Sequence, residues 1–402
     1  MGTTADIHAW LSANAHRVDS TDPAATGRDL DNLLAGLDSA TVVGLGESTR
    51  FSRQTCGVRE RVFRALVRRH GFRALAIQDS AQSGARWDRF VTTGVSDPET
   101  VLSDAWRPWR TEETIATLQW IRAYNRAHPD DPVRIFGVQP THAEPSDYDA
   151  VLASVRDTAP EQLAAMDAHL APIRTAHQVD EHVQRYRGVH PGRPFVEHAR
   201  DALALLEALP DTPERATALT HARLIRDFHQ HSVAGQGSFA RDERPDAETV
   251  IEWQRTTGAK IAYWDGLAHT TNARITMESA EFRGVGSYLR EHFGDRYISV
   301  AIGFHHGNLG VAVAPDPLPD LIDATLGALD LPAFYVDLHA DAPESVRRWL
   351  TTPAKARTIS GVYDPAADAT AHIRVQSLAA AFDVLIHVRE TTPVRWLPQV
   401  SV

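Results

Sequence analysis

Short stretches of consecutive apolar and often β-branched residues recur along the chain, each bounded by turn-forming residues. Continuous apolar runs are typical of strands covered on both faces of a sheet, whereas half-exposed strands alternate apolar and polar side chains. The pattern therefore predicts buried strands over residues 41–47, 73–79, 133–139, 260–265, 297–304, 334–338 and 382–388.

Helical spacing of apolar residues fills the segments between these strands, for example over residues 113–125 and 286–293. Alternating strands and helices are typical of an α/β fold. We therefore predict a largely parallel central sheet with helices on both faces.

One long region, residues 146–250, lacks the strand pattern and instead contains helical segments separated by proline-containing turns. We predict that residues 1–145 and 251–402 form the α/β core and that residues 146–250 form an all-helical insertion. Ligands of open α/β sheets bind beyond the carboxyl ends of the strands, so this insertion is a candidate lid. Its helices are expected over residues 160–170, 196–209 and 214–231.

The charge balance bears on the choice of partner. The 402 residues carry a net charge of −11, and we expect no nucleic-acid partner, because neutralising phosphates requires a stripe of lysine and arginine. Arginines are dense between residues 59 and 69, but they alternate with apolar residues. That pattern is typical of the exposed face of an amphipathic helix.

Neither a signal peptide nor a membrane-spanning segment is expected, because the first 20 residues are polar and no run of about 18 apolar residues occurs. Cys56 is the single cysteine, so no internal disulfide can form, and we expect a cytoplasmic protein with no membrane partner. A nucleophilic role for Cys56 would need a basic neighbour that lowers the thiol pKa.

Candidate chemistry gathers where the predicted strands end. Glu47 ends the first strand, and Arg50 and Arg53 follow within six residues. A nearby guanidinium favours the charged carboxylate, which suits Glu47 as an acceptor or orienting group. An ion pair that only braces the loop is the equally weighted alternative.

Other strands contribute polar ends of their own, so a pocket that binds a small molecule by hydrogen bonds is expected. His269 follows the strand at 260–265 and is the best candidate for general acid or base, since an ordinary histidine titrates near neutral pH. His305 and His306 are adjacent in the sequence, so their side chains are expected to point apart if this segment is extended. The predicted substrate-binding residues are Gln54, Gln78, Gln139, His305 and His306.

Motifs for a cofactor or a metal are missing from the sequence. Gly44-Leu45-Gly46 has no third glycine at the spacing of a dinucleotide fingerprint, and no phosphate-binding loop or nucleophile elbow occurs. No cysteine cluster or His-Glu-x-x-His helix is found. We therefore expect neither cofactor nor metal.

The same strand ends resemble the erythromycin esterases. The family motif Gly-Glu-Ala-Thr-His-Gly-Thr-Arg-Glu is similar to residues 46–54, which read Gly-Glu-Ser-Thr-Arg-Phe-Ser-Arg-Gln. Residues 120–125, Trp-Ile-Arg-Ala-Tyr-Asn, resemble a family helix, and residues 260–269 lie where the family has Trp-Ala-His-Asn-Ala-His. Further similarity at residues 286–290 and 382–392 extends the resemblance from about residue 40 to the C-terminus.

The resemblance implies an erythromycin-esterase fold and metal-independent hydrolysis of macrolactones by a histidine that activates water. The family's catalytic histidine corresponds to Arg50, and a guanidinium cannot accept a proton near neutral pH. Glu47, Arg53 and His269 are kept. Acids of the family correspond to Gln54, Gln78 and Gln139, and a histidine of the family corresponds to Gly266.

These replacements predict a site that has lost negative charge and gained positive charge, which suits stabilising an oxyanion better than making hydroxide. The leading hypothesis is a tailoring enzyme of natural-product biosynthesis with a polyketide-like small-molecule substrate. It would catalyse a cyclisation, internal addition or elimination, with His269 and Glu47 moving protons and Arg50 and Arg53 holding an anion. The alternatives are an esterase that uses His269 as base and a catalytically silent binding or resistance protein.

Overall fold

In the computed structural model of the chain, the residues described are 4–178, 181–186, 188–190, 192–231, 242–277, 280–359, 361 and 363–398. The chain divides into two compact units. An α/β unit comprises residues 1–101, 110–139 and 242–402, and a helical unit comprises residues 102–109 and 140–241.

A nine-stranded sheet forms the centre of the α/β unit, in the order β1-β10-β13-β8-β2-β5-β3-β4 with β9 paired to β8. The strands from β13 to β4 are parallel to their neighbours, whereas β10, β1 and β9 pair antiparallel. The predicted α/β fold with a largely parallel sheet is confirmed. The strands are β1 (His16–Arg17), β2 (Val42–Glu47), β3 (Phe72–Ser80), β4 (Arg134–Gln139), β5 (Lys260–Gly266), β8 (Tyr297–Asn308), β9 (Val313–Ala314), β10 (Ala333–Asp337) and β13 (Val384–Thr391).

Strand β2 lies between β5 and β8, and all six of its residues are buried. Two of them are glycines because neighbouring groups approach the backbone closely. A Cβ added to Gly44 would lie 2.3 Å from Oη of Tyr297, and one added to Gly46 would lie 2.0 Å from Oγ1 of Thr270. The glycines therefore let the segment that follows β5 pack directly on β2.

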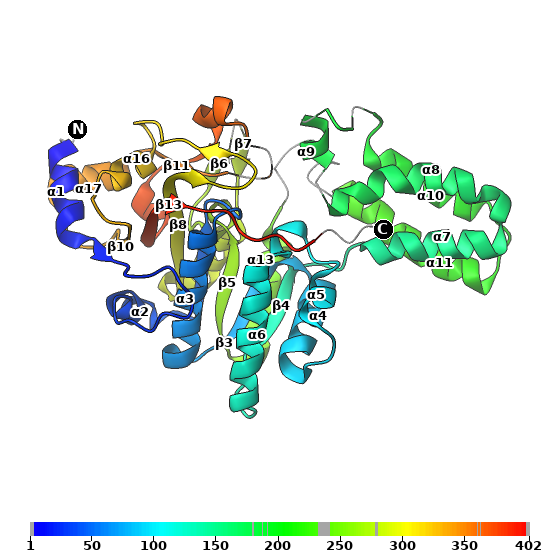
Figure 1. Cartoon of the computed structure of the whole chain (residues 1–402), viewed down its shortest axis with the longest axis horizontal. Helices are drawn as coiled ribbons and strands as arrows, with labels where there is room; N and C mark the ends of the chain where they lie inside the picture. Colours follow the sequence, from blue (N-terminus) through cyan, green and yellow to red (C-terminus); the bar gives the residue numbers. More distant parts are fainter. Residues whose placement is uncertain are drawn as a thin grey trace. The chain divides into compact units, whose positions relative to one another are not determined.

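Helices α3 (Arg53–His70) and α6 (Glu112–Ala127) lie in front of the strands in Figure 1, coloured blue and teal. Helices α13 (Arg244–Thr257) and α15 (Val285–Phe293) pack against the sheet through a cluster of buried apolar side chains. That cluster includes Val42 of β2, Ala76 of β3 and Val138 of β4. Layers of helix on a parallel sheet explain why the strands read as continuous apolar runs.

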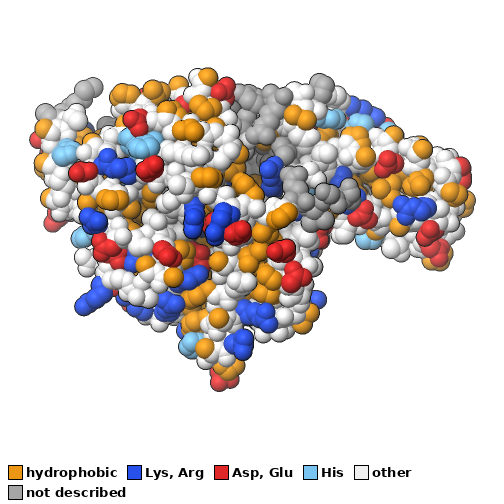
Figure 2. All heavy atoms as spheres, viewed as in Figure 1, with side chains coloured by type: hydrophobic (Ala, Val, Ile, Leu, Met, Phe, Trp, Pro, Cys, Tyr) orange, Lys and Arg blue, Asp and Glu red, His pale blue; other side chains and the backbone are white. Residues whose placement is uncertain are grey.

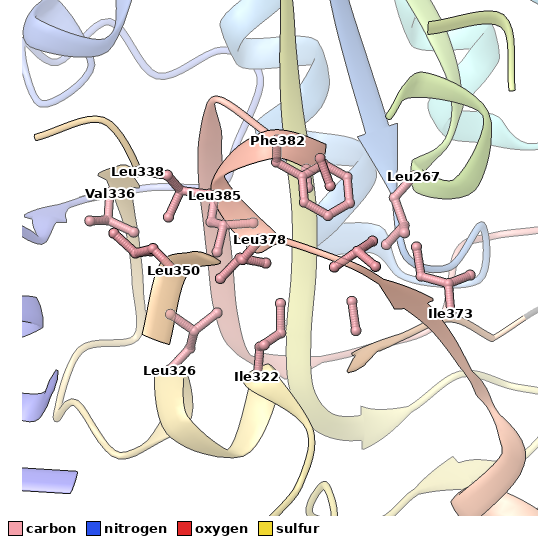
Figure 3. Packing of buried hydrophobic residues seen from close by; sticks show 14 of the residues in the cluster. Leu267, Ile322, Leu326, Val336, Leu338, Leu350, Ile373, Leu378, Phe382 and Leu385 are labelled. Carbon is pink, nitrogen blue, oxygen red and sulfur yellow. The ribbon is translucent and has the colours of Figure 1, made fainter. Parts of the chain in front are cut away.

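A second apolar cluster joins β10 and β13 to the short helices α16 (Ile322–Gly327), α17 (Glu344–Thr351), α14 (Leu267–Thr270) and α18 (Leu378–Ala381). Figure 3 shows Leu267 pointing into this cluster with Phe382 and Leu385. A four-stranded antiparallel sheet contributes Ile275 and Ile373 to the same cluster. Its strands are β11 (Ala354–Arg357), β12 (His372–Val375), β6 (Ile275–Met277) and β7 (Ala280–Phe282).

The helical unit has an apolar core of its own. At its centre, Tyr148 lies 2.8 Å from Nε2 of His229 and 3.0 Å from Nε2 of His177, measured from the tyrosine Oη. Burial lowers the pKa of His229 to about 3 and holds the pKa of His177 well below its ordinary value. The main helices are α7 (Pro145–Thr158), α8 (Leu163–Arg174), α9 (Glu181–Tyr186), α10 (Phe195–Glu207) and α11 (Pro213–His231).

The helical unit differs from the expected insertion at both boundaries. It begins at residue 140 in this part of the chain and ends at residue 241, so α13 belongs to the α/β unit. Residues 232–241 of the predicted insertion lie outside the described residues. That the insertion acts as a lid stays a prediction.

Among the described residues, no helix combines the length and apolar character needed to cross a bilayer. On the face of the molecule in Figure 2, lysine and arginine side chains are interspersed with aspartate and glutamate. Mixed charges of this kind differ from the basic stripe that a phosphate backbone requires.

Candidate active site

Strands β2 and β5 run parallel side by side, and their carboxyl ends place two acids together. Glu47 pairs in register with Gly266, and Asp265 pairs with Gly46. Glu47 is 2% exposed and Asp265 is 1% exposed, so both carboxylates need charged or hydrogen-bonding partners. The structure supplies these partners from the loop after β2 and from α3.

Arg59 of α3 donates a hydrogen bond to Oε2 of Glu47. The guanidinium also lies over the Trp264 ring, 4.3 Å from its centroid. On the other side of the carboxylate, Nε of Arg50 lies 3.5 Å from Oε1. Glu47 is therefore held between two arginines, and Arg59 is 4% exposed.

The prediction that the arginines between residues 59 and 69 form an exposed helix face was wrong for Arg59. It was also wrong for Arg61, which is 3% exposed.

Arg50 joins the two strand ends. Its Nη2 lies 2.8 Å from Oδ1 of Asp265 and donates a hydrogen bond to the side-chain oxygen of Gln78 at the end of β3. Asp265 also accepts hydrogen bonds from Oη of Tyr263 and, at 2.6 Å, from the backbone N–H of Gly266. Two arginines thus face two carboxylates. Each guanidinium of this cluster has a carboxylate beside it, and the loss of negative charge relative to the family stays a prediction.

His269 lies on the short helix α14 directly after β5. Leu267 and Ala268 anchor this helix in the apolar cluster of Figure 3. Nδ1 of His269 is 2.7 Å from Oε1 of Glu243, whose Oε2 accepts a hydrogen bond of 3.1 Å from the backbone N–H of Val285. Glu243 is 5% exposed, so its two oxygens are fixed between α14 and α15.

The surroundings of His269 favour its protonated form. Burial opposes the charge, but the carboxylates of Asp265 and Glu243 outweigh burial and raise the pKa of His269 to about 9. A quarter of the side chain is exposed. Within the described residues, Nε2 has no hydrogen-bond partner, so an N–H at this atom is unpaired there.

Gly266 lies between His269 and Arg50. A Cβ added there would lie 3.4 Å from Cδ2 of His269 and 3.7 Å from Nη2 of Arg50, which are ordinary van der Waals distances. Packing therefore does not demand glycine at this position. The same distances place His269 and Arg50 both next to Gly266.

Two other predicted residues, Arg53 and Gln54, lie on the first turn of α3, and their hydrogen bonds and ion pairs go to other residues. The side chain of Arg53 is 53% exposed, and its Nε lies 3.9 Å from Oε1 of Glu113. Gln54 bonds Thr392, accepting from its backbone N–H at 2.7 Å and donating to its hydroxyl at 2.9 Å. Gln54 therefore ties α3 to the segment after β13.

Burial raises the pKa of the Cys56 thiol to about 12, so Cys56 lacks the thiolate that a nucleophile needs.

Gln139 ends β4 opposite Ser80 of β3 and is half-buried. Its backbone belongs to the same edge of the sheet as Gln78 and Glu47.

His305 and His306 lie further along β8, beyond Ile302, which pairs with Glu47. The expectation that these adjacent side chains point apart was wrong. Their Nδ1 atoms are 2.8 Å apart, and both lie within 3.4 Å of Oδ1 of Asp316. They form a separate cluster of their own.

Three site residues were not predicted from the sequence: Arg59, Asp265 and Glu243. Asp265 stood at a predicted strand end, so its position was a usable signal. Arg59 and Glu243 lie within or next to helices, and nothing in local spacing distinguishes them from surface charges.

Comparison with known proteins identifies the family. The model of the erythromycin esterase family matches residues 67–391, and the chain belongs to this family. The match begins after the loop that carries Arg50.

Individual relatives are distant. A Bacillus subtilis (strain 168) protein named "Putative hydrolase YbfO" is 21% identical over 388 residues, covering 86% of this chain and 84% of its own. A crystal structure of a succinoglycan biosynthesis protein superposes with a TM-score of 0.68 at 19% identity, covering 98% of this chain and 99% of the other. A variant of the erythromycin esterase EreC in its open conformation superposes with a TM-score of 0.57 at 15% identity, covering 96% and 99%. At these identities the structures show a shared fold.

Proposed function

We propose that this chain is an enzyme that acts on a small natural product by proton donation from His269, without activating water. The observation that carries the proposal is the ion pair of His269 with Glu243. The carboxylates of Asp265 and Glu243 raise the pKa of His269 to about 9, and a quarter of its side chain is exposed. The reaction class is cyclisation, internal addition or elimination on a polyketide-like substrate. Membership of the erythromycin esterase family supports this substrate class, because erythromycin is a polyketide.

The protonation state decides between acid and base. A histidine with a pKa of about 9 is neutral in roughly one molecule in a hundred at pH 7. A general base must be neutral to accept a proton from water, whereas an imidazolium is ready to donate one. Proton transfer from Nε2 to a carbonyl oxygen or a leaving hydroxyl is therefore the chemistry that this pair favours.

The ion-pair cluster has a supporting role in this proposal. Arg50 is fixed by Asp265 and Gln78, so it presents a rigid positive group near Gly266 and His269. Preorganised charge of this kind stabilises a developing oxyanion without reorganisation during the reaction. Glu47 fixes Arg50 and Arg59 and acts as a positioning residue.

The fate of water tests the reaction class. Candidate polyketide-like substrates, and a macrolide as a reference ester, are incubated with the protein in oxygen-18 water. Mass spectrometry then measures the incorporation of oxygen-18 into the products. We expect product with no oxygen-18. Label in a product carboxylate would overturn the proposal in favour of hydrolysis. Tight binding of a compound that is recovered unchanged would overturn it in favour of a binding protein.

The pH profile tests the role of His269. In Glu243→Gln the carboxylate charge is lost, so the pKa of His269 falls toward the ordinary histidine value of about 6.5. The alkaline limb of kcat/KM should therefore move to lower pH, while His269→Ala removes most turnover. Glu252→Gln, an exposed acid on α13, is the matched control and leaves the limb in place. An unmoved limb in Glu243→Gln would contradict proton donation by His269.

Hydrolysis is the second candidate, because the family is named for an esterase and one relative is named as a hydrolase. It requires neutral His269 as base. Its rate would rise with pH through about 9, opposite to the profile expected for an acid.

A further inference from the structure

A hairpin at the end of β8 brings three metal-binding side chains together. Strand β9 turns back along β8 with Gly307 opposite Ala314 and Asn308 opposite Val313. Continuing this antiparallel register places Asp316 opposite His305. Nδ1 of His305 and Nδ1 of His306 lie 3.4 Å and 3.1 Å from the same Oδ1 of Asp316.

The mutual distances match those of ligands around one ion. The two Nδ1 atoms are 2.8 Å apart, so the three separations run from 2.8 to 3.4 Å. Metal–nitrogen bonds of about 2.0–2.1 Å, with bond angles from octahedral to tetrahedral, place ligand atoms about 2.9–3.4 Å apart. The pair of histidines also packs as a T-shaped contact, with ring centroids 5.1 Å apart.

The scaffold holds His305 in this orientation. A Cβ added to Gly327 would lie 1.9 Å from Cδ2 of His305, so glycine at the end of α16 makes room for the ring. Arg357, fully buried, donates a hydrogen bond to the carbonyl of His305, and its own charge is matched by Asp368 at 2.7 Å. Gly307 has a φ of 139°, which favours glycine, directly after His306.

We propose that His305, His306 and Asp316 bind one divalent transition-metal ion of the Zn²⁺ or Co²⁺ class. Two imidazoles and one carboxylate favour such ions over Mg²⁺ and Ca²⁺, which prefer oxygen ligands. The side chains of His306 and Asp316 are 35% and 77% exposed, so the remaining coordination positions face solvent. Three protein ligands with an open position are typical of sites that bind a water or a substrate group.

Cobalt spectroscopy tests the site directly. Full-length protein without a polyhistidine tag is stripped with a chelator, dialysed and titrated with Co²⁺, with the visible d–d absorption and the melting temperature as readouts. We expect a saturable band at one equivalent, a raised melting temperature, competition by Zn²⁺ and none by Ca²⁺. No cobalt band in the wild type would overturn the proposal.

Variants locate the binding. His306→Ala and Asp316→Asn should each weaken affinity by about 100-fold, because loss of even an outer-shell partner costs about 10–100-fold. His292→Ala removes an exposed histidine that lies outside the cluster and should bind like the wild type. Wild-type affinity in both cluster variants would place the ion elsewhere among the 20 histidines and overturn the proposal.

Circular dichroism confirms the fold of each variant, and Asp316→Asn, a change at an exposed loop position, serves if His306→Ala unfolds. Because every readout is binding or stability, the result does not depend on the proposed reaction of His269.

Discussion

Glu47 is a buried carboxylate whose charge is stabilised by two arginines. It is 2% exposed, and Arg59 and Arg50 face its two oxygens. A buried ion pair adds little net stability compared with apolar residues of the same size. Removing one partner is costly all the same, because the remaining charge is left in a poorly solvating interior.

Substitution of Arg59 should therefore be far more damaging than its net contribution suggests. In Arg59→Met, the aliphatic part of the side chain is largely kept, while the charge and the guanidinium over Trp264 are lost. We expect a loss of about 3–5 kcal/mol in the free energy of unfolding. Urea unfolding at pH 7 measures it. The control is Arg255→Met, whose guanidinium pairs with Glu252 on the surface at 71% exposure. Its cost should be about 0–1 kcal/mol, and equal losses in the two variants would refute the buried-charge argument.

The sequence predicted Glu47, Arg50 and His269 as candidates because they follow strands, and the carboxyl ends of parallel strands meet at one edge. It did not predict Arg59 or Glu243. Their roles depend on partners 12 and 26 residues away along the chain, at separations that only the packed fold creates. Helical periodicity assigns charged residues to solvent by default, and that rule failed for Arg59 and Arg61.

At the scale of elements, all seven predicted strands are present, because burial on both faces leaves an unmistakable apolar run. The small antiparallel sheet was not predicted. Its strand β11 reads Ala-Lys-Ala-Arg, and β7 is three residues long, so neither shows an apolar run. These strands depend on the second apolar cluster, which forms only when distant segments meet.

Helix α4 (Ala81–Thr93) packs on β4 without an intervening side chain. A Cβ added to Gly84 would lie 2.0 Å from the backbone nitrogen of Gly137, and one added to Gly137 would lie 1.9 Å from the carbonyl oxygen of Ser80. Contacts this short involve backbone on both sides, so relief requires the helix to move away from the sheet.

Gly84→Ala should destabilise the protein by about 1–3 kcal/mol through overpacking. Gly36→Ala is the matched control, because Gly36 is an exposed residue of helix α2 (Asp31–Leu37) with nothing within 4 Å of the added Cβ. It should stabilise by about 0.5–1 kcal/mol, since alanine is the better helix former. Thermal and urea unfolding of both variants measure these opposite signs, and two changes of the same sign would contradict the packing account.

For the whole molecule, the division into two units matters because each has its own core. The sequence predicted the helical insertion from the missing strand pattern, but its ends were displaced, since α13 continues the helical periodicity while packing on the sheet. Boundaries depend on which core a helix joins, and amphipathic spacing alone does not say which.

Acid should destabilise the helical unit through its buried histidine, His229. The folded pKa of His229 is about 3, below its ordinary value, so the unfolded state binds the extra proton first and stability is lost as pH falls from about 6.5 toward 3. Urea unfolding at pH 7 and pH 4.5 should show a steeper loss in the wild type than in His229→Gln. Proteolytic cuts at pH 4.5, mapped by mass spectrometry, should fall within residues 140–231. His292→Gln, at an exposed position, should keep the wild-type pH dependence. The same loss of unfolding free energy between pH 7 and pH 4.5 in all three proteins would exclude His229 as the cause.

The strand order carries a consequence for how the chain is made. Strands β2 and β3 follow one another in the chain, yet β5 lies between them and leaves the ribosome more than 200 residues after β2. At about 5–20 residues per second, β2 waits roughly 10–40 s for its first neighbour in the sheet. The helical unit is complete within that interval and can fold while the apolar strands β2, β3 and β4 are still unpaired or incompletely paired. A nascent chain of this protein therefore has an early folded part and a late one, and the long exposure of β2 makes it a natural client for chaperones that bind apolar segments at the ribosome exit.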